Sequence, residues 1–302
     1  MSDSKIIDLI IEPDEKDLGE FTVRRSLPAA GQRMIGPWLF FDHMGPATFA
    51  PGQGVAVRPH PHINLSTVTY LFEGEILHRD SLGSVGTIRP GDINLMVAGK
   101  GIVHSERERP EVNEVEHRLH GLQLWLALPE EDEETEPAFY HYPGEDLPVV
   151  KVGSDIDGVT VRVMMGSAYG VTSPVKIHAD TLYVEADLKQ GQSLALPSAD
   201  ERGLYLVSGK VEARDNSGDA SEPVLIDKHK FAVLSPNADV QLTALEDSRL
   251  ALIGGENIGP RHLFWNFASS SKQRIEQAGQ DWKDGKFPKI PGDEEEFIPL
   301  PD

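Results

Sequence analysis

The sequence predicts an all-β protein built from two tandem barrels and a C-terminal helix. Short apolar segments alternate with turns along the 302-residue chain, which contains 28 glycines and 22 prolines, and this pattern is typical of many short strands. A segment near residue 70 is repeated near residue 205, as expected of a duplicated unit. Helical periodicity is almost absent before the last forty residues.

The first domain is expected to contain turn-bounded strands within 20–30, 36–46, 68–77, 87–107 and 120–129. The acidic, proline-bounded stretch PEEDEETEPAFYHYPGEDLP then follows at 129–148 and indicates a solvated linker. We therefore predict an N-terminal domain at 1–135, a linker at 136–148 and a second domain, with the helix and tail, at 149–302.

The internal repeat supports the prediction of two barrels. YLFEGEI, starting at Tyr70, resembles YLVSGKV, starting at Tyr205, and each segment turns at a glycine. Further along, NLMVA from Asn94 aligns with FAVLS from Phe231. Two copies of one small β unit indicate duplicated barrels.

The single helical pattern lies in SSSKQRIEQAGQDWKDGKF near the end of the chain. Ile275, Ala278 and Trp282 are spaced i, i+3, i+7, and serines precede them as candidate N-caps. This spacing predicts a helix that packs its apolar face on the outside of the β domains.

Charge and composition exclude several classes of function. The net charge of −21 disfavours direct binding to nucleic acid, since no basic run exceeds Arg24-Arg25. The chain has no cysteine, which rules out disulfides, thiolate nucleophiles and cysteine-based zinc sites. No apolar segment reaches transmembrane length and the N-terminus lacks a signal-peptide pattern, so we expect a cytoplasmic protein without membrane contact.

Two pairs of polar side chains form a candidate metal site. His60 and His62 are spaced i, i+2, so they share one face of a strand, and the proline between them stiffens the segment. His104 and Glu106 repeat this spacing after a glycine turn. On adjacent strands of a barrel the pairs would bring together three imidazoles and a carboxylate, a set that suits a transition metal. Scattered surface histidines are the alternative.

The spacing of these residues resembles the cupin fold and, within it, the pirin family. Gly54 and Gly101 precede the two pairs at the distances found in the two cupin motifs. The resemblance covers nearly the whole chain, and its main segments are HPH from His60, TVTYLFEG from Thr67, PGD from Pro90, AGKGIVHSE from Ala98, GLQLW from Gly121, FPKIPGD from Phe287 and FIPLP from Phe297.

The resemblance implies two tandem cupin (double-stranded β-helix) barrels, of which only the first holds Fe(II). It assigns the metal ligands to His60, His62, His104 and Glu106. The sequence does not distinguish iron from nickel, copper, manganese or zinc.

The internal repeat independently indicates that the second barrel lacks a metal. Aligning the two copies places other residues at the four ligand positions, namely Ala195, Pro197, Gln241 and Thr243. His178 and His229 fall outside these positions and are expected in strands or turns.

One segment departs from the usual pirin pattern. Many pirins continue HPH with x-Gly-Phe-Glu-Thr-Val, whereas this chain has INLSTV from Ile63. Ser66 stands where many other cupins have a metal-binding glutamate, so the carboxylate is expected from Glu106. Because residues around the ligands tune a metal and shape its pocket, this departure bears on the substrate more than on metal binding.

For the other aromatic and histidine residues, the sequence indicates a position in the fold less specifically than it does for the candidate metal ligands. His43 is a candidate for contact with the site's ligands, and His78 is expected on the surface. Barrel-rim positions are expected for His117 and His120, and core positions for Phe40, Phe41, Leu95 and Trp125.

The resemblance implies two functions from different classes. Some pirins cleave the flavonol quercetin with dioxygen, which implies a small aromatic substrate, with Glu106 as the catalytic group that accepts a hydroxyl proton. Others act as redox-responsive regulatory proteins that bind a protein partner such as a transcription factor or a metabolic enzyme.

Overall fold

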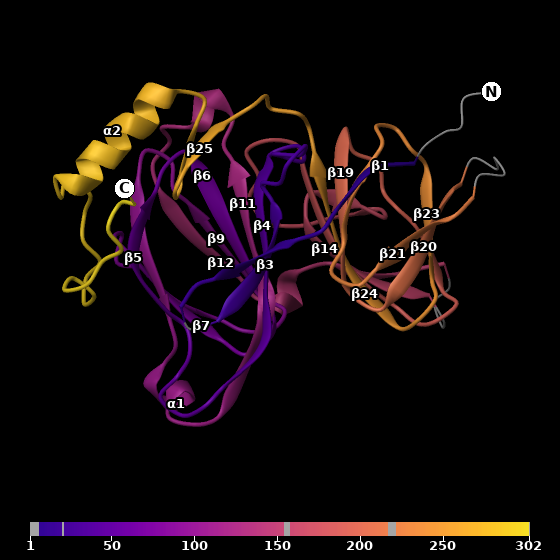
Figure 1. Ribbon diagram of the computed structural model, residues 1–302, viewed down its shortest axis with the longest axis horizontal. Coiled ribbons are helices and arrows are strands. Elements are labelled where there is room, and N and C mark those ends of the chain that lie inside the picture. Colours follow the sequence, from indigo (N-terminus) through magenta and orange to yellow (C-terminus); the bar gives the residue numbers. More distant parts are fainter. Residues whose placement is uncertain (1–5, 20, 154–157, 217–221, 302) are drawn as a thin grey trace. The chain divides into compact units, whose positions relative to one another are not determined.

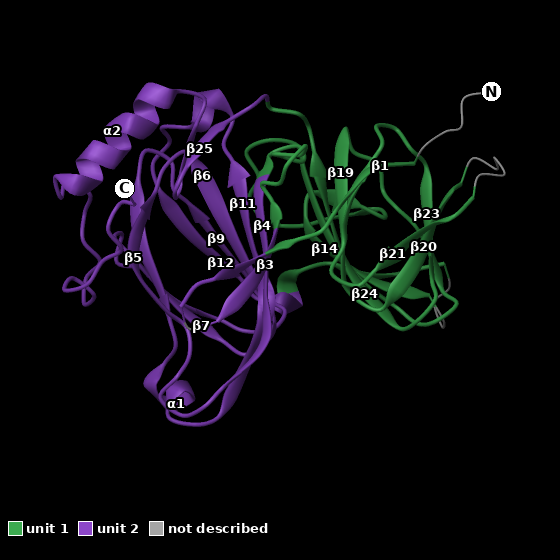
Figure 2. Cartoon of the chain, in the orientation of Figure 1, with its two compact units in different colours: residues 1–14, 26–38, 146–258 green, residues 15–25, 39–145, 259–302 purple. Residues whose placement is uncertain are grey.

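The computed structural model describes residues 6–19, 21–153, 158–216 and 222–301. The chain divides into two compact units, coloured separately in Figure 2. Unit 1 comprises residues 1–14, 26–38 and 146–258, and unit 2 comprises residues 15–25, 39–145 and 259–302. Each unit contains one seven-stranded and one four-stranded antiparallel sheet, which confirms the all-β fold of two cupin domains.

The elements of unit 2 are coloured purple in Figure 2. Its large sheet has the order β12 (Ala138–Tyr142), β9 (Ile93–Val97), β6 (Leu65–Glu73), β11 (His117–Ala127), β4 (Trp38–Phe49), β3 (Thr22–Leu27) and β2 (Asp14–Asp17). Its small sheet has the order β5 (Ala56–His62), β10 (Ile102–Arg107), β7 (Ile76–Asp80) and β8 (Val85–Ile88). Short elements complete it: α1 (Pro110–Asn113), the 3₁₀ turns Glu130–Asp132 and Gly144–Asp146, and the hairpin of β25 (His262–Phe264) and β26 (Phe267–Ser269).

Unit 1 repeats the same arrangement. Its large sheet has the order β1 (Ile7–Ile11), β22 (Phe231–Leu234), β19 (Glu201–Ser208), β24 (Ser248–Gly255), β17 (Thr181–Leu188), β14 (Val159–Met165) and β13 (Val149–Val152). Its small sheet has the order β18 (Ser193–Ala195), β23 (Val240–Ala244), β20 (Lys210–Asp215) and β21 (Val224–Asp227). A two-stranded ribbon pairs β15 (Ser167–Ala168) with β16 (Val171–Thr172).

The two large sheets match strand for strand when their orders are compared. β6 corresponds to β19 and β9 to β22, which are the segments that the internal repeat aligned. The outermost position is taken by β12 in unit 2 and by β1 in unit 1. The N-terminal strand therefore completes the barrel formed by the second half of the chain.

This division differs from the predicted domain ranges in several places. Residues 26–38, expected in the first domain, belong to unit 1. Residues 138–142 of the predicted linker form β12, which pairs with β9 along five residues. Residues 259–302, expected in the second domain, belong to unit 2, and residues 1–14 belong to unit 1. Strand pairing depends on distant segments, so local composition does not reveal it. The acidic residues that made this stretch look like a linker lie in the turns on either side of β12.

The C-terminal helix α2 (Lys272–Lys283) forms where its periodicity predicts it. The hydroxyl of Ser271 accepts a hydrogen bond from the backbone N–H of Arg274, the usual N-cap arrangement. Ile275 and Ala278 are buried and pack with Ile63 and Phe267 in a small apolar cluster. The helix therefore lies against unit 2, where it contacts β25 and β26 (Figure 1).

Aliphatic side chains fill the interior of unit 1 at the places where unit 2 carries candidate ligands. Ala195 and Gln241 pair across β18 and β23 as the repeat predicts, but they are exposed and half-exposed. The neighbouring pair, Leu194 and Leu242, is buried in the core cluster. A shift of one residue in a strand reverses the face, so the inward positions lie one residue from those in the sequence alignment.

Glu185 on β17 gives unit 1 a pH-dependent stability. Burial raises the pKa of Glu185 to about 8, although the hydroxyl of Tyr183 donates a 2.6 Å hydrogen bond to its carboxylate. The unfolded carboxyl group ionises near its ordinary value of 4.5. Folding stability is therefore lost progressively as pH rises from about 4.5 to about 8.

The Glu185→Gln variant should recover this stability. Its melting temperature is expected to exceed that of the unsubstituted protein more at pH 8.5 than at pH 6, because each pKa unit corresponds to about 1.4 kcal/mol. Glu212→Gln, at a half-exposed position on β20, is the control and should change stability by no more than about 0.5 kcal/mol. If the difference in melting temperature between Glu185→Gln and the unsubstituted protein were the same at pH 6 and pH 8.5, the prediction would be contradicted.

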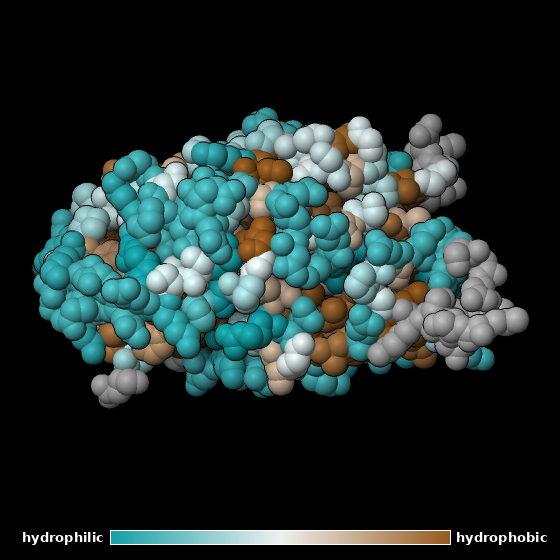
Figure 3. Space-filling model, turned by 90° about the horizontal axis from the view of Figure 1, so that it is seen from above, coloured by the Kyte–Doolittle hydropathy of each residue, from teal (hydrophilic) through white to brown (hydrophobic). Residues whose placement is uncertain are grey.

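The surface agrees with the charge of the chain. The face shown in Figure 3 is mainly hydrophilic, with smaller apolar areas between the polar residues. Within the described residues, neither α1 nor α2 is long and apolar enough to cross a membrane.

Candidate metal centre

The antiparallel pairing of β5 and β10 brings the two sequence motifs together. His104 lies opposite His60, and Ile102 lies opposite His62. β5 is the edge strand of its sheet, so the prolines of the HPH motif do not interrupt a central ladder. The register shifts by one residue just before His60, where β5 contains the extra residue, and such a bulge re-aims side chains.

Three histidines converge inside unit 2. One ring nitrogen from each of His60, His62 and His104 lies within 4.8 Å of the others. The Nε2 atoms of His62 and His104 are 3.1 Å apart. The three residues are only 6%, 1% and 1% exposed, so the cluster is shielded from water.

The opposite ring nitrogens hold each imidazole in place. Nδ1 of His60 donates to the Arg58 carbonyl at 2.8 Å, and Nδ1 of His62 donates to the Asn266 carbonyl at 3.0 Å. Because a carbonyl only accepts, these contacts place the proton on Nδ1 and leave the Nε2 lone pair unprotonated. Nitrogen lone pairs that point at one another in a buried space repel, and a metal cation bound between them would relieve this repulsion.

The electrostatics favour neutral imidazoles. Burial lowers the pKa of His60 to about 4. Burial also lowers the pKa of His62 and His104 well below the ordinary range, and their histidine neighbours add to this effect. Neutral imidazole is the form that binds a metal, so the three residues fit a transition metal at neutral pH.

Glu106 follows His104 by two residues in β10 but is not part of the group of converging nitrogens. Its carboxylate accepts a hydrogen bond from Nε2 of Gln123 at 3.3 Å, and Thr69 donates to the Gln123 side chain at 2.8 Å. Burial raises the pKa of Glu106 to about 7. Its assignment as the fourth ligand stays a prediction.

His78 is buried, so the prediction that it lies on the surface was wrong. It is 5% exposed and faces the outer nitrogen of His104, with 3.4 Å between the two Nδ1 atoms. Its Nε2 lies 3.0 Å from a carboxylate oxygen of Asp80. Asp80 in turn accepts the backbone N–H groups of Leu82 and Ser84.

Asp80 and His78 therefore form a chain that ends at a candidate ligand. If Asp80 accepts from Nε2 of His78, then Nδ1 of His78 is free to accept from His104. The alternation His-x-Asp after the Glu-Gly-Glu turn was the sequence signal for this pair, because i and i+2 residues share a strand face.

Trp125 and Phe40 form an aromatic wall beside the histidines. Their rings stack with centroids 4.0 Å apart, and Trp125 meets the His62 ring edge-on at 5.0 Å. Both residues are buried, as expected of core residues. Trp125 nevertheless contacts the candidate ligand His62. The alternating pattern of its strand did not indicate this contact.

The INLS segment joins the two motifs. Asn64 adopts a left-handed backbone conformation with φ of 56°, which asparagine tolerates better than most residues. Its backbone N–H donates to the Gly99 carbonyl at 2.8 Å, and its side chain donates to Glu134 at 3.0 Å. The departure from the usual pirin pattern thus includes a residue that ties HPH to the glycine turn before His104.

The remaining histidines lie outside the converging group. His43 is fully buried and its Nε2 lies 2.7 Å from Nε2 of His120. Nε2 of His117 lies 2.9 Å from a carboxylate oxygen of Glu108.

Comparisons with known proteins agree with this fold. The family model Pirin matches residues 20–126, and the Pirin C-terminal cupin domain matches residues 183–288. A pirin-like protein of Caulobacter vibrioides is 47% identical over 98% of this chain and 100% of its own length. The chain belongs to the pirin family.

Two further relatives of this pirin carry a name that refers to an activity. A Pseudomonas aeruginosa protein named "Putative quercetin 2,3-dioxygenase" is 39% identical over 88% of this chain and 80% of its own length. The crystal structure of a quercetin 2,3-dioxygenase from Acinetobacter baumannii superposes with a TM-score of 0.87 at 33% identity, covering 98% of this chain and 95% of that one.

The Asp80→Asn variant tests the buried chain behind His104. An asparagine amide presents an N–H group or a weaker acceptor to His78, so His104 is held less firmly. We expect the affinity for a divalent metal to fall about 10–100-fold with little change in backbone fold by circular dichroism. Asp92→Asn, at a turn of the same unit, is the control. Equal metal affinities for Asp80→Asn and the unsubstituted protein would show that the chain does not support the ligand.

Proposed function

We propose that this pirin is a mononuclear Fe(II) protein with ring-cleaving activity of the quercetin 2,3-dioxygenase type. The observation that carries the proposal is the buried convergence of His60, His62 and His104, whose outer nitrogens are already engaged. The similarity to proteins named as quercetin 2,3-dioxygenases supports the choice of reaction.

In this proposal His60, His62, His104 and Glu106 hold the metal. When bound, Fe(II) supplies coordination positions at which a flavonol and dioxygen are brought together. Glu106 accepts the proton of the flavonol hydroxyl group at its carboxylate. Gln123 donates to that carboxylate and so orients it.

The aromatic wall fits a flat aromatic substrate. Trp125 contacts both Phe40 and His62, so we expect a ring system bound beside the metal ligands to lie near this indole. Offset and edge-on aromatic contacts contribute about 0.5–1.5 kcal/mol each. Burial of the site also keeps bulk water away from the reacting groups.

The proposal is tested with anaerobically purified protein. Bound iron is measured first, and quercetin loss is then followed together with oxygen uptake. We expect iron at one atom per chain and equimolar consumption of quercetin and dioxygen. Protein that is fully loaded with iron and consumes neither would refute the flavonol dioxygenase proposal and would favour the regulatory alternative.

The Glu106→Gln variant separates the two roles given to Glu106. Glutamine keeps an oxygen that Gln123 can contact but carries no negative charge. Loss of turnover with retained iron would assign Glu106 to proton transfer, whereas loss of both would assign it to metal binding as well. Full turnover in this variant would contradict both roles.

A further inference from the structure

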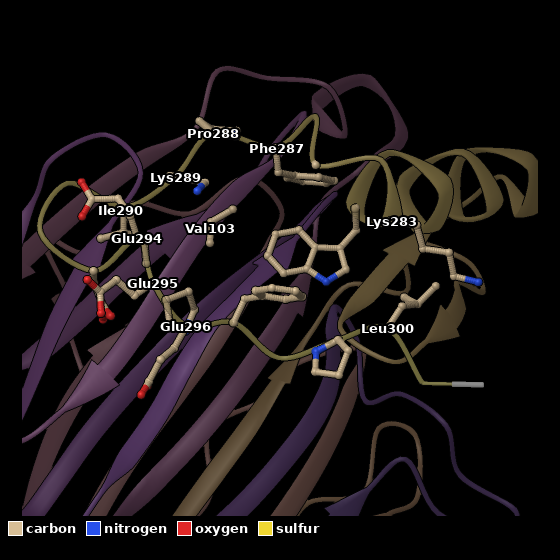
Figure 4. Close-up of a pocket in the computed structure, with 16 residues that line it drawn as sticks. Val103, Lys283, Phe287, Pro288, Lys289, Ile290, Glu294, Glu295, Glu296 and Leu300 are labelled. Atoms are coloured by element: carbon tan, nitrogen blue, oxygen red, sulfur yellow. The ribbon is translucent and has the colours of Figure 1, made fainter.

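A cavity of about 400 Å³ lies under the C-terminal tail of unit 2, apart from the histidine cluster (Figure 4). Its volume falls within the range of small-molecule sites. The tail after α2 forms one wall, and Pro59 of β5 and Val103 of β10 form part of the other. Val103 directly precedes His104 in the paired part of β10, so it faces the opposite side of that strand.

Three aromatic rings form the apolar end of the cavity. The ring of Trp282 meets those of Phe287 and Phe297 nearly at right angles, with both centroids 5.8 Å away. Phe297 is nevertheless 56% exposed. An exposed large aromatic side chain next to a cavity is typical of a binding site.

The wall made by the tail is held by specific bonds. Nε1 of Trp282 donates to the Ile298 carbonyl at 3.0 Å, and the Ile298 N–H donates to the Pro59 carbonyl at 2.9 Å. Arg107 binds both carboxylate oxygens of Asp293 at 2.8 Å. The cavity is thus a formed feature, and a ligand would enter it without first ordering the tail.

Carboxylates line the other end of the cavity. Glu294, Glu295 and Glu296 follow one another in the tail and are exposed, and Figure 4 shows them on the side away from Lys283. Arg107 engages Glu296, whereas no ion pair is found for Glu294 or Glu295 within the described part of the chain.

The charge balance favours a cation. The lining contains four carboxyl groups and two amines, those of Lys283 and Lys289. Arg107 pairs with two of the carboxyl groups, those of Asp293 and Glu296, so a small negative excess remains. The chain as a whole has a net charge of −21, and its field attracts cations and repels anions. Aromatic faces also attract a cation through their quadrupole.

We propose that this cavity binds a small organic cation with an aromatic or apolar body. The body would pack among Trp282, Phe287 and Phe297, and the ammonium group would lie toward Glu294 and Glu295. This site is independent of the metal centre and of the reaction proposed there.

The test compares two probes that share one body and differ in charge. Phenethylamine and 3-phenylpropionate are titrated by calorimetry into the full chain after chelation of metal. We expect one phenethylamine site per chain, with an affinity about tenfold higher than that for 3-phenylpropionate. Equal affinities, or preference for the acid, would overturn the proposal.

Variants locate the binding site. Phe297→Ala should weaken phenethylamine binding about tenfold, and the double substitution Glu294→Gln with Glu295→Gln should weaken it several-fold. Phe264→Ala removes a ring of similar exposure, 43%, from β25 outside the cavity and should change nothing. His60→Ala should bind phenethylamine normally, since the metal centre is not involved.

The same variants distinguish other occupants. Binding that is lost in His60→Ala but kept in Phe297→Ala would place the amine at the metal centre and refute the proposal. A dimer in light scattering that Phe297→Ala dissociates, without amine binding to either form, would assign the cavity to a second copy of the chain and would equally refute it.

Discussion

The His60→Ala variant is expected to lose its bound metal. His60 lies opposite His104 across the β5–β10 pair, and its Nδ1 contact with the Arg58 carbonyl presents its other nitrogen to the cluster. Removing it leaves two converging histidines. The loss in metal affinity should exceed the roughly 10–100-fold that removal of an outer hydrogen-bond partner costs. Metal content per chain after dialysis, and competition with a chromophoric chelator, measure this loss.

His262→Ala is the matched control for this substitution. His262 lies in β25 of the same unit and is exposed, so its removal should leave the metal content unchanged. Thermal melting of the metal-free proteins shows whether His60→Ala retains the fold. A folded His60→Ala protein with full metal occupancy would refute the assignment of His60 as a ligand.

Replacing Glu133 by alanine should produce the largest loss of folding stability among the substitutions considered. Glu133 lies 3.0 Å from Nε of Arg261 and accepts further hydrogen bonds from Ser269 and the backbone N–H of Ser270. Both members of the ion pair are less than 10% exposed. Removing one partner leaves a buried, uncompensated charge, which costs about 3–5 kcal/mol.

The same substitution should also weaken metal binding. Glu133 anchors the segment that supplies the Asn266 carbonyl, and this carbonyl accepts from Nδ1 of His62. Denaturant unfolding and metal titration of Glu133→Ala measure the two effects separately. If stability fell while metal affinity stayed unchanged, the link between the segment and His62 would be refuted.

Glu134→Ala provides a control one residue away. Glu134 pairs with Arg274 at 2.7 Å, but it is 56% exposed, and exposed pairs contribute about 0–1 kcal/mol. If Glu134→Ala lost as much folding stability as Glu133→Ala, burial of the ion pair would not determine how much stability its removal costs.

The sequence alone predicts much of the candidate centre because its pattern is local. The i, i+2 spacing of His60 with His62 fixes their shared face once the segment is a strand. The glycine turn before His104 brings the second motif back toward the first. The helix α2 is predicted for the same reason, because its apolar spacing and its serine N-cap lie close together in the sequence.

Strand partners were harder to predict because pairing depends on distant segments. Residues 138–142 have the composition of a linker, yet they pair with β9. The N-terminal strand β1 takes the matching place beside β22. In the second barrel the internal repeat identified the paired strands, but it placed the inward residues one position away, because alignment does not determine which face is buried.

The sequence by itself determined the family, the two β domains and the convergence of the motif histidines. The tertiary structure decided what supports those histidines. The carbonyl that orients His62 comes from Asn266, 204 residues later, and the group behind His104 is His78, from β7. Each imidazole is oriented by a contact across the fold or by a bulge in its own strand, and such contacts exist only once distant segments of the chain have packed together.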